Sequence, residues 1–268
     1  MINYEKICKQ VIEISKVAGK FIRNEKGKIT TGNIETKSLN SLVTYVDKTS
    51  EKMIVDALKD FLPEAGFITE EGTETKQAKT YNWIVDPLDG TTNFIHGLEP
   101  FAVSIALKEN EEIVVGVVYE VGKDECFYAC KNSPAYLNNK EIHVTETDKL
   151  ANSLVATGFP YYDFSENKPI LESLEYFMKH SHGIRRLGSA ATDLVYVACG
   201  RLEAFYEFGL SPWDVAAGAF IVQQAGGKVC DFNKGDNYIF GREIVAGNSK
   251  VFDEFAEIIH KYLSNSKE

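Results

Sequence analysis

The sequence lacks a long apolar run, and this absence excludes membrane-spanning proteins. No stretch of the 268 residues approaches the roughly 18 consecutive apolar residues of a membrane helix. The N-terminal segment, MINYEKICKQVIEISKVAGK, is charged throughout and contains no apolar core of a signal peptide. The chain has only five cysteines, an odd number that indicates no disulfide framework in a chain of this length. We therefore expect a cytoplasmic protein.

Positive charge is scarce as well. Lys and Arg number 29 against 39 Asp and Glu, which gives a formal net charge of -10 at pH 7, and no long basic run offsets this average. Such a chain repels nucleic acid and anionic membranes, so we expect neither as a partner. The negative net charge also repels any small anionic substrate, and a binding site for such a substrate would therefore need bound cations.

Two kinds of pattern follow each other along the chain. Apolar residues at helical spacing predict helices over 7–21 and 47–62, and runs rich in Val and Ile predict strands over 81–85, 101–107 and 113–119. The turn at 109–111 predicts a hairpin with a longer loop, and 27–40 is expected to be a loop. Beyond about residue 150, strand and helix patterns alternate. We expect an α+β half at 1–148 and an α/β half at 149–268 in one continuous globular unit.

The most informative motif is Asp86-Pro87-Leu88-Asp89-Gly90, which follows a short apolar strand. Pro87 disfavours the helical region for Asp86, and Gly90 permits a close backbone approach. Hard cations such as Mg²⁺ bind carboxylate and carbonyl oxygens, so both aspartates and the Leu88 carbonyl are candidate ligands. The alternative is an ordinary turn, because Asp, Pro and Gly are common in turns.

Two distant segments make the turn interpretation less attractive. Glu70, in Glu70-Glu71-Gly72, ends another β-rich run. Asp214 stands after Trp213 in the first turn of an apolar helix, where burial would require a cation or donors. Each has a simpler explanation, since a Glu pair often lies in a solvated loop and an Asp at this position often caps a helix.

Together these segments resemble the inositol monophosphatase family of lithium-sensitive, magnesium-dependent phosphatases. The likeness runs from Lys37 to about Ala246, with Trp83 to Phe94 similar to the first family signature and Trp213 to Gly227 similar to the second. The resemblance implies a layered αβαβα sandwich of the inositol monophosphatase and fructose-1,6-bisphosphatase type. It also implies a homodimer and two or three Mg²⁺ ions per subunit.

The resemblance assigns roles residue by residue. The implied metal ligands are Glu70, Asp86, the Leu88 carbonyl, Asp89 and Asp214. The implied catalytic residues are Glu70 and Thr91, which activate a water, and Asp47, an outer carboxylate. The implied substrate contacts are Asp89, Gly90, Thr91, Thr92, Gly188, Ser189, Ala190, Glu207 and Asp214. Lys37 matches a lysine of the mobile loop over the metals. Ser41 replaces an aspartate that is frequent in the family, which affects lid closure and a third metal.

The expected activity is Mg²⁺-dependent hydrolysis of a small phosphorylated polyol, foremost myo-inositol 1-phosphate, by attack of an activated water. Two alternatives stay open: a 3′(2′),5′-bisphosphate nucleotidase or fructose-1,6-bisphosphatase, and an inactive regulatory dimer. Arg185 and Arg186, near His180 and His182, form the main positive cluster. It would contact a second phosphate, pair with nearby acids, or lie at a subunit interface.

Overall fold

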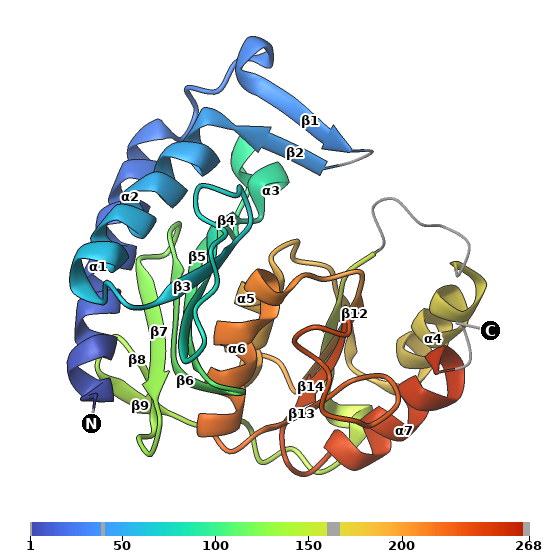
Figure 1. Cartoon of the computed structure of the whole chain (residues 1–268). Helices are drawn as coiled ribbons and strands as arrows, with labels where there is room; N and C mark the ends of the chain where they lie inside the picture. Colours follow the sequence, from blue (N-terminus) through green and yellow to red (C-terminus); the bar gives the residue numbers. More distant parts are fainter. Residues whose placement is uncertain (1, 39–40, 160–166, 265–268) are drawn as a thin grey trace.

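A computed structural model describes residues 2–38, 41–159 and 167–264 of the chain. Five layers follow one another, helices, sheet, helices, sheet, helices, as Figure 1 shows. The outer helices on one side are α1 (Tyr4–Glu25) and α2 (Tyr45–Phe61), and those on the other are α4 (Asn167–His180) and α7 (Phe252–Leu263). The expected αβαβα sandwich is therefore confirmed.

The first large sheet has seven strands in sequence order. Its first two strands are parallel and all later neighbours are antiparallel. The strands are β3 (Gly66–Thr69), β4 (Tyr81–Asp89), β5 (Ala102–Glu109), β6 (Glu112–Glu120), β7 (Glu125–Cys130), β8 (Ala135–Leu137) and β9 (Lys140–Ile142). This sheet therefore carries the Asp86 motif at one end of a central, buried strand.

The second sheet has five strands in the order β11-β10-β12-β14-β13. The strands are β10 (Leu154–Thr157), β11 (Gly183–Arg185), β12 (Ala204–Phe208), β13 (Lys228–Cys230) and β14 (Glu243–Gly247). Strands β10, β11 and β12 run parallel, and β14 pairs antiparallel with both β12 and β13. Strand β12, which carries Glu207, is the middle strand of this sheet.

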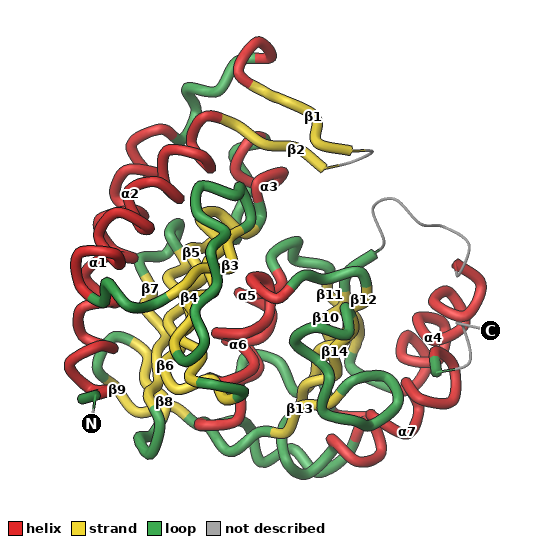
Figure 2. The backbone as a smooth tube through the Cα atoms, in the orientation of Figure 1, coloured by secondary structure: helices red, strands yellow, loops and turns green. Residues whose placement is uncertain are grey.

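The inner layer consists of α5 (Ala190–Ala198) and α6 (Pro212–Gln224), which lie between the two groups of strands in Figure 2. Both helices contact strands of the two sheets. Residues 190–198 and 215–222 are buried all round, and many are small. A helix sandwiched between sheets needs no polar face, which explains why α6 has no amphipathic stripe. The boundary near residue 148 stays a prediction, although this layer joins both sheets.

The outer helix α1 follows the sequence pattern closely. Asn3 caps its first turn by accepting a hydrogen bond from Lys6 N, and its buried stripe packs on the seven-stranded sheet. The helix α2 begins with a capping box made by Thr44 and Asp47. Within the described residues, no helix combines the length and the apolarity that crossing a bilayer requires.

Two local predictions are wrong. Glu109 pairs with Glu112, so the β5–β6 turn has two residues instead of a longer loop. Asn110 adopts a φ of 53°, a conformation that Asn tolerates and a tight hairpin requires. The segment predicted as a loop over 27–40 contains a short 3₁₀ helix η1 (Thr31–Asn33) and the strand β1 (Ile34–Ser38). This strand pairs with β2 (Ser41–Thr44).

The remaining short elements complete the fold. They are α3 (Thr91–Ile95), directly after the Asp86 motif, and the 3₁₀ helix η2 (Leu150–Asn152). Three apolar clusters fill the spaces between the five layers. The helix ends and strand ends that carry the acidic motifs meet where the first sheet faces the inner helices.

Candidate metal centre and active site

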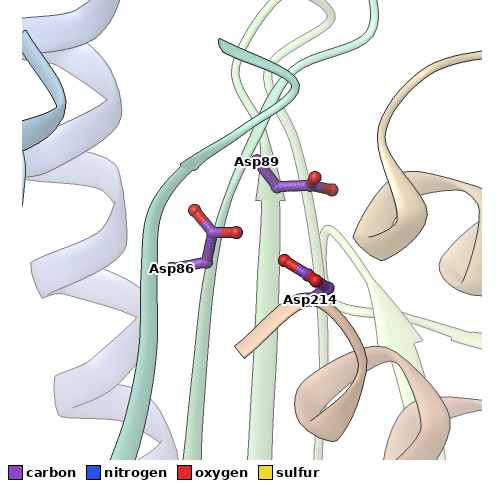
Figure 3. Close-up of side chains that lie close together, drawn as sticks. All are labelled: Asp86, Asp89 and Asp214. Carbon is purple, nitrogen blue, oxygen red and sulfur yellow. The ribbon is translucent and has the colours of Figure 1, made fainter. Parts of the chain in front are cut away.

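Three aspartates from two elements converge on one point. Asp86 and Asp89 lie at the end of β4, and Asp214 lies in the first turn of α6. Each offers a carboxylate oxygen, and these three atoms all lie within 4.8 Å of one another. Figure 3 shows the three side chains directed toward a common space. Carboxylates at this separation can share a cation.

A bulge in β4 explains why Asp86 and Asp89 face the same space. Residues three apart in a regular strand point to opposite faces of the sheet. Here Asp86 pairs with Ser104 and Asp89 pairs with Ala102, so β4 contains one residue more than β5 over this stretch. Pro87 lies in this bulge, where the ladder lacks a donor. The extra residue turns Asp89 to the side of Asp86.

The carboxylates influence one another strongly. Burial, followed by the charges of Glu70, Asp89 and Asp214, raises the pKa of Asp86 well above its ordinary range. Burial and the charge of Asp89 do the same to the pKa of Asp214, and the charge of Glu70 contributes there too. Glu70, which directly follows β3, is therefore close enough for its charge to act on both aspartates. Its backbone N–H donates to the Val85 carbonyl at 3.3 Å, which ties it to β4.

Hydrogen-bond donors of the protein partly compensate the burial of Asp89. Burial raises its pKa to about 6, although donors oppose this shift. Its Oδ2 atom accepts from Ser189 Oγ at 2.6 Å and from the Ala191 N–H at 2.8 Å, at the start of α5. Such bonds hold the carboxylate in one orientation and link β4 to the start of α5 at the site.

Thr91 connects Asp47 with the Asp86 motif. Asp47 is fully buried, and its Oδ2 accepts from the Thr44 N–H at 2.8 Å and the Thr44 hydroxyl at 2.7 Å. Its Oδ1 accepts from Thr91 Oγ1 at 2.8 Å, while the same hydroxyl lies 3.0 Å from the Leu88 carbonyl. A hydroxyl has one hydrogen, so donation to Asp47 leaves the Leu88 carbonyl lone pairs for another partner.

Gly90 allows another part of the chain to approach the motif. Its φ is 88°, and a Cβ atom would lie 3.0 Å from the Pro100 carbonyl and 3.3 Å from the Gly188 carbonyl. Asn93, whose role the sequence did not reveal, fastens this approach by donating through Nδ2 to the Pro100 and Leu187 carbonyls, both at 2.8 Å. Its only signal was its place in the long motif.

Glu207 is held at the same site from the second sheet. It lies on β12 and is 7% exposed, and burial raises its pKa to about 8 against the influence of Arg186. The charge of Asp89 also raises this pKa, so Glu207 lies within range of that charge. Gly158 makes room for Glu207, because a Cβ atom there would lie 1.8 Å from Glu207 Oε1. Sequence reasoning missed this function of Gly158.

Asp193 is a further acidic residue that the sequence did not single out. It lies in the first turn of α5, and its Oδ1 atom is buried without a hydrogen-bond partner among the described residues. Burial, then the charges of Glu207 and Asp89, raises its pKa well above the ordinary range. The signal that marked Asp214, an acid in the first turn of an apolar helix, was present here too.

The other predicted residues lie in different settings. Gly188, Ser189 and Ala190 form the start of α5 beside Asp89, whereas Thr92 lies on the exposed side of α3. The backbone of Lys37 belongs to β1, but its side chain and that of Ser41 lie outside the described part of the chain. The charge of Arg186 lowers the pKa of Asp89 and of Glu207, so this arginine acts within the acidic site.

The comparisons with known proteins agree with this geometry. The model of the inositol monophosphatase family matches residues 3–265. A putative Nus factor SuhB from Neisseria meningitidis serogroup B is 39% identical over 92% of this chain and 95% of its own. An inositol-1-monophosphatase from Mesorhizobium japonicum is 36% identical over 95% of this chain and 96% of its own.

A solved structure matches over nearly the whole length. The crystal structure of extragenic suppressor protein suhB from Bartonella henselae superposes with a TM-score of 0.91 and 35% identity. The match covers 96% of this chain and 99% of that one. Because the family model, the relatives and the fold agree over almost every residue, the chain belongs to the inositol monophosphatase family and is a phosphomonoesterase.

Proposed function

We propose that this protein is a Mg²⁺-dependent phosphatase whose main substrate is a myo-inositol monophosphate. The observation that carries the proposal is the convergence of the Asp86, Asp89 and Asp214 oxygens within 4.8 Å. The group contains neither nitrogen nor sulfur ligands, a donor set that suits Mg²⁺ better than zinc or copper. Burial raises the pKa of each carboxylate, so a cation would compensate charges that otherwise need protons.

The residues that would hold the metal are the three aspartates, Glu70 and the Leu88 carbonyl. When bound, Mg²⁺ supplies positive charge that neutralises the phosphate and lowers the pKa of an attacking water. The protein contributes position. Asp89 is fixed by Ser189 and Ala191, and Asp86 by the bond from the Leu88 N–H to its Oδ1 at 2.9 Å.

Thr91 and Asp47 are proposed to orient the water. The 2.8 Å bond between them fixes the Thr91 hydroxyl, whose oxygen lone pairs can then accept a hydrogen bond from a water beside Glu70. Phosphate oxygens would be held by the backbone N–H groups of Gly90 and Thr91. Phosphoryl transfer depends mainly on such positioning and charge compensation, and no covalent nucleophile is required.

Substrate choice is proposed to depend on Glu207 and the start of α5. Glu207 and Asp89 are both hydrogen-bond acceptors, and Glu207 lies within range of the charge of Asp89, an arrangement that suits the hydroxyl groups of a polyol. The charge of Arg186 acts on Glu207, and an arginine at this place could bind a second phosphate. A bisphosphate nucleotidase or a fructose-1,6-bisphosphatase is therefore the alternative. The convergence of Asp86, Asp89 and Asp214 speaks against an inactive regulatory dimer.

The names of the relatives do not decide the substrate. Some are named inositol-1-monophosphatase and others Nus factor SuhB, with similar identities to this chain. We also propose a cytoplasmic homodimer with two or three Mg²⁺ ions per subunit and inhibition by lithium. The dimer, the number of ions and the lithium inhibition rest on family likeness.

The test is phosphate release with Mg²⁺ across a panel of inositol monophosphates, 3′-phosphoadenosine 5′-phosphate and fructose 1,6-bisphosphate. We expect the highest kcat/KM with an inositol monophosphate. A Glu207→Ala variant should lose more activity on that substrate than on a generic phosphate ester. Highest activity on a bisphosphate, or equal losses in the variant, would reject this substrate assignment.

A further inference from the structure

The helix α2 carries three polar side chains on its buried face. Asp47, Ser50 and Glu51 are each 0% exposed, and their spacing of three and four residues places them on one side of the helix. Apolar residues of α2, among them Val46 and Ile54, already pack in the adjacent core. Buried polar groups cost free energy unless they are bonded, so these three residues require a specific reason to be there.

Glu51 is bound to the turn that follows Glu70. Its Oε2 accepts from the Glu71 N–H at 2.7 Å, and its Oε1 accepts from the Thr73 N–H, also at 2.7 Å. A carboxylate with two backbone donors forms strong, directional bonds. The Glu70 N–H is itself bound to the Val85 carbonyl on β4. Glu70 is therefore fixed on one side by β4 and on the other by α2.

The two other polar residues of this face reach the neighbouring segments. Ser50 Oγ donates to the Pro87 carbonyl at 3.1 Å, inside the bulge between Asp86 and Asp89. Asp47 accepts from the Thr91 hydroxyl at 2.8 Å. One helix thus contacts three segments that contribute to the site: the turn after Glu70, the β4 bulge and the start of α3.

We infer that α2 is the positioning helix of the metal centre, and that Glu51 is the residue through which it holds Glu70 in place. This inference rests on the proposed function, since it assumes that Glu70 is a metal ligand. Glu51 is a positioning residue and touches neither metal nor substrate. Outer partners of this kind fix the orientation of ligands, and their loss commonly weakens metal binding by about 10–100-fold.

The variant Glu51→Gln tests the inference because it keeps the size of the side chain and removes one acceptor. Its amide NH₂ would face a backbone N–H, so one of the two bonds is lost. Asp56→Asn is the matched control, since Asp56 lies on the exposed side of α2 and pairs with Lys52 at 2.9 Å. Both variants remove one negative charge from the same helix.

Two readouts need no substrate. Calorimetric titration of the metal-free protein with MgCl₂ should show about tenfold weaker binding in Glu51→Gln and unchanged binding in Asp56→Asn. Amide hydrogen exchange at Glu71 and Thr73 should be faster in Glu51→Gln, while exchange in the core of β4 stays as in the wild type. Unchanged Mg²⁺ affinity in a folded Glu51→Gln protein would overturn the inference.

Further measurements keep the test decisive if Glu51→Gln does not fold. Glu51→Asp retains both acceptors and withdraws them by one methylene, and it should also bind Mg²⁺ more weakly; normal affinity would overturn the inference. In the wild type, the Thr73 amide should exchange slowly although the residue is exposed. Rapid exchange there would equally refute the bond. Absence of any Mg²⁺ binding by the wild type would instead refute the proposed function.

Discussion

Replacing Asp86 by Asn should stabilise the metal-free protein and remove much of its response to Mg²⁺. Asp86 is 2% exposed, and Asn has nearly the same shape. The side-chain oxygen of Asn can still accept the bond from the Leu88 N–H, which is 2.9 Å long in the wild type. The substitution therefore removes a charge from the cluster and leaves its packing intact.

The magnitude follows from the separation of the carboxylates. At the 4.8 Å limit, two unit charges repel by about 3.5 kcal/mol at an effective dielectric constant of about 20. The wild type avoids part of this cost by binding protons, because the pKa of Asp86 is raised by burial and by Glu70, Asp89 and Asp214. We expect a net gain of about 1–3 kcal/mol in the free energy of unfolding at pH 8. For a chain of this size that corresponds to about 2–12 °C in Tm.

The assay is calorimetric unfolding of both proteins at pH 8, once with EDTA and once with MgCl₂. In EDTA, Asp86→Asn should unfold at the higher temperature. With Mg²⁺ the wild type should gain more stability, because ligand binding to the folded state adds RT ln(1 + [L]/Kd) and the variant has lost a ligand. With Mg²⁺, the difference between the two Tm values should therefore shrink or change sign.

Two results would refute this reasoning. A lower Tm of Asp86→Asn in EDTA would mean that the carboxylate stabilises the fold through bonds and not as a site for a cation. An equal Tm increase by Mg²⁺ in both proteins would mean that the ion binds elsewhere. Asp56→Asn, an exposed charge removal on α2, is the control for a general effect of net charge.

The remaining predictions concern single residues of the same site. Glu207→Gln should raise the Tm of the metal-free protein near pH 8 and much less near pH 5. The pKa of Glu207 is raised to about 8 in the folded state from the ordinary 4.5. The wild type therefore loses stability as pH rises across that window and Glu207 ionises, whereas the variant does not. A Tm gain of the variant that grows toward acid pH would contradict this. Asp89→Asn should abolish phosphate release without unfolding the chain, and full turnover with Mg²⁺ would disprove its assignment. Gly158→Ala should raise KM for an inositol monophosphate, because the new Cβ would lie 1.8 Å from Glu207 Oε1 and must displace it; an unchanged KM would separate Glu207 from substrate binding.

Local patterns in the sequence were enough to predict much of the framework. The stripe from Ile7 to Phe21 identified α1 because helical spacing depends on the chain alone. The same kind of pattern placed Asp214 in the first turn of an apolar helix, and α6 begins at Pro212. Turns were less predictable: the Asn110 hairpin is tighter than expected, since its left-handed backbone is favoured only once β5 and β6 pair.

Candidate ligands were also recognisable before the fold was known, as acidic residues at the ends of β-rich runs and in the first turn of an apolar helix. Their neighbours were not. Glu51 is 22 residues from Thr73, and Ser189 is 100 residues from Asp89. No local pattern reveals such bonds, because their partners meet only when distant segments of the chain pack together.

The amino-acid sequence by itself indicated which side chains carry the oxygen atoms that a hard cation prefers and which segments form helices, since both depend on side-chain chemistry and local spacing. Only the tertiary structure decided that the bulge at Pro87 turns Asp89 toward Asp86, that α2 supports the site, and that Gly158 admits Glu207. These relations arise from packing between distant segments, and packing is a property of the folded chain.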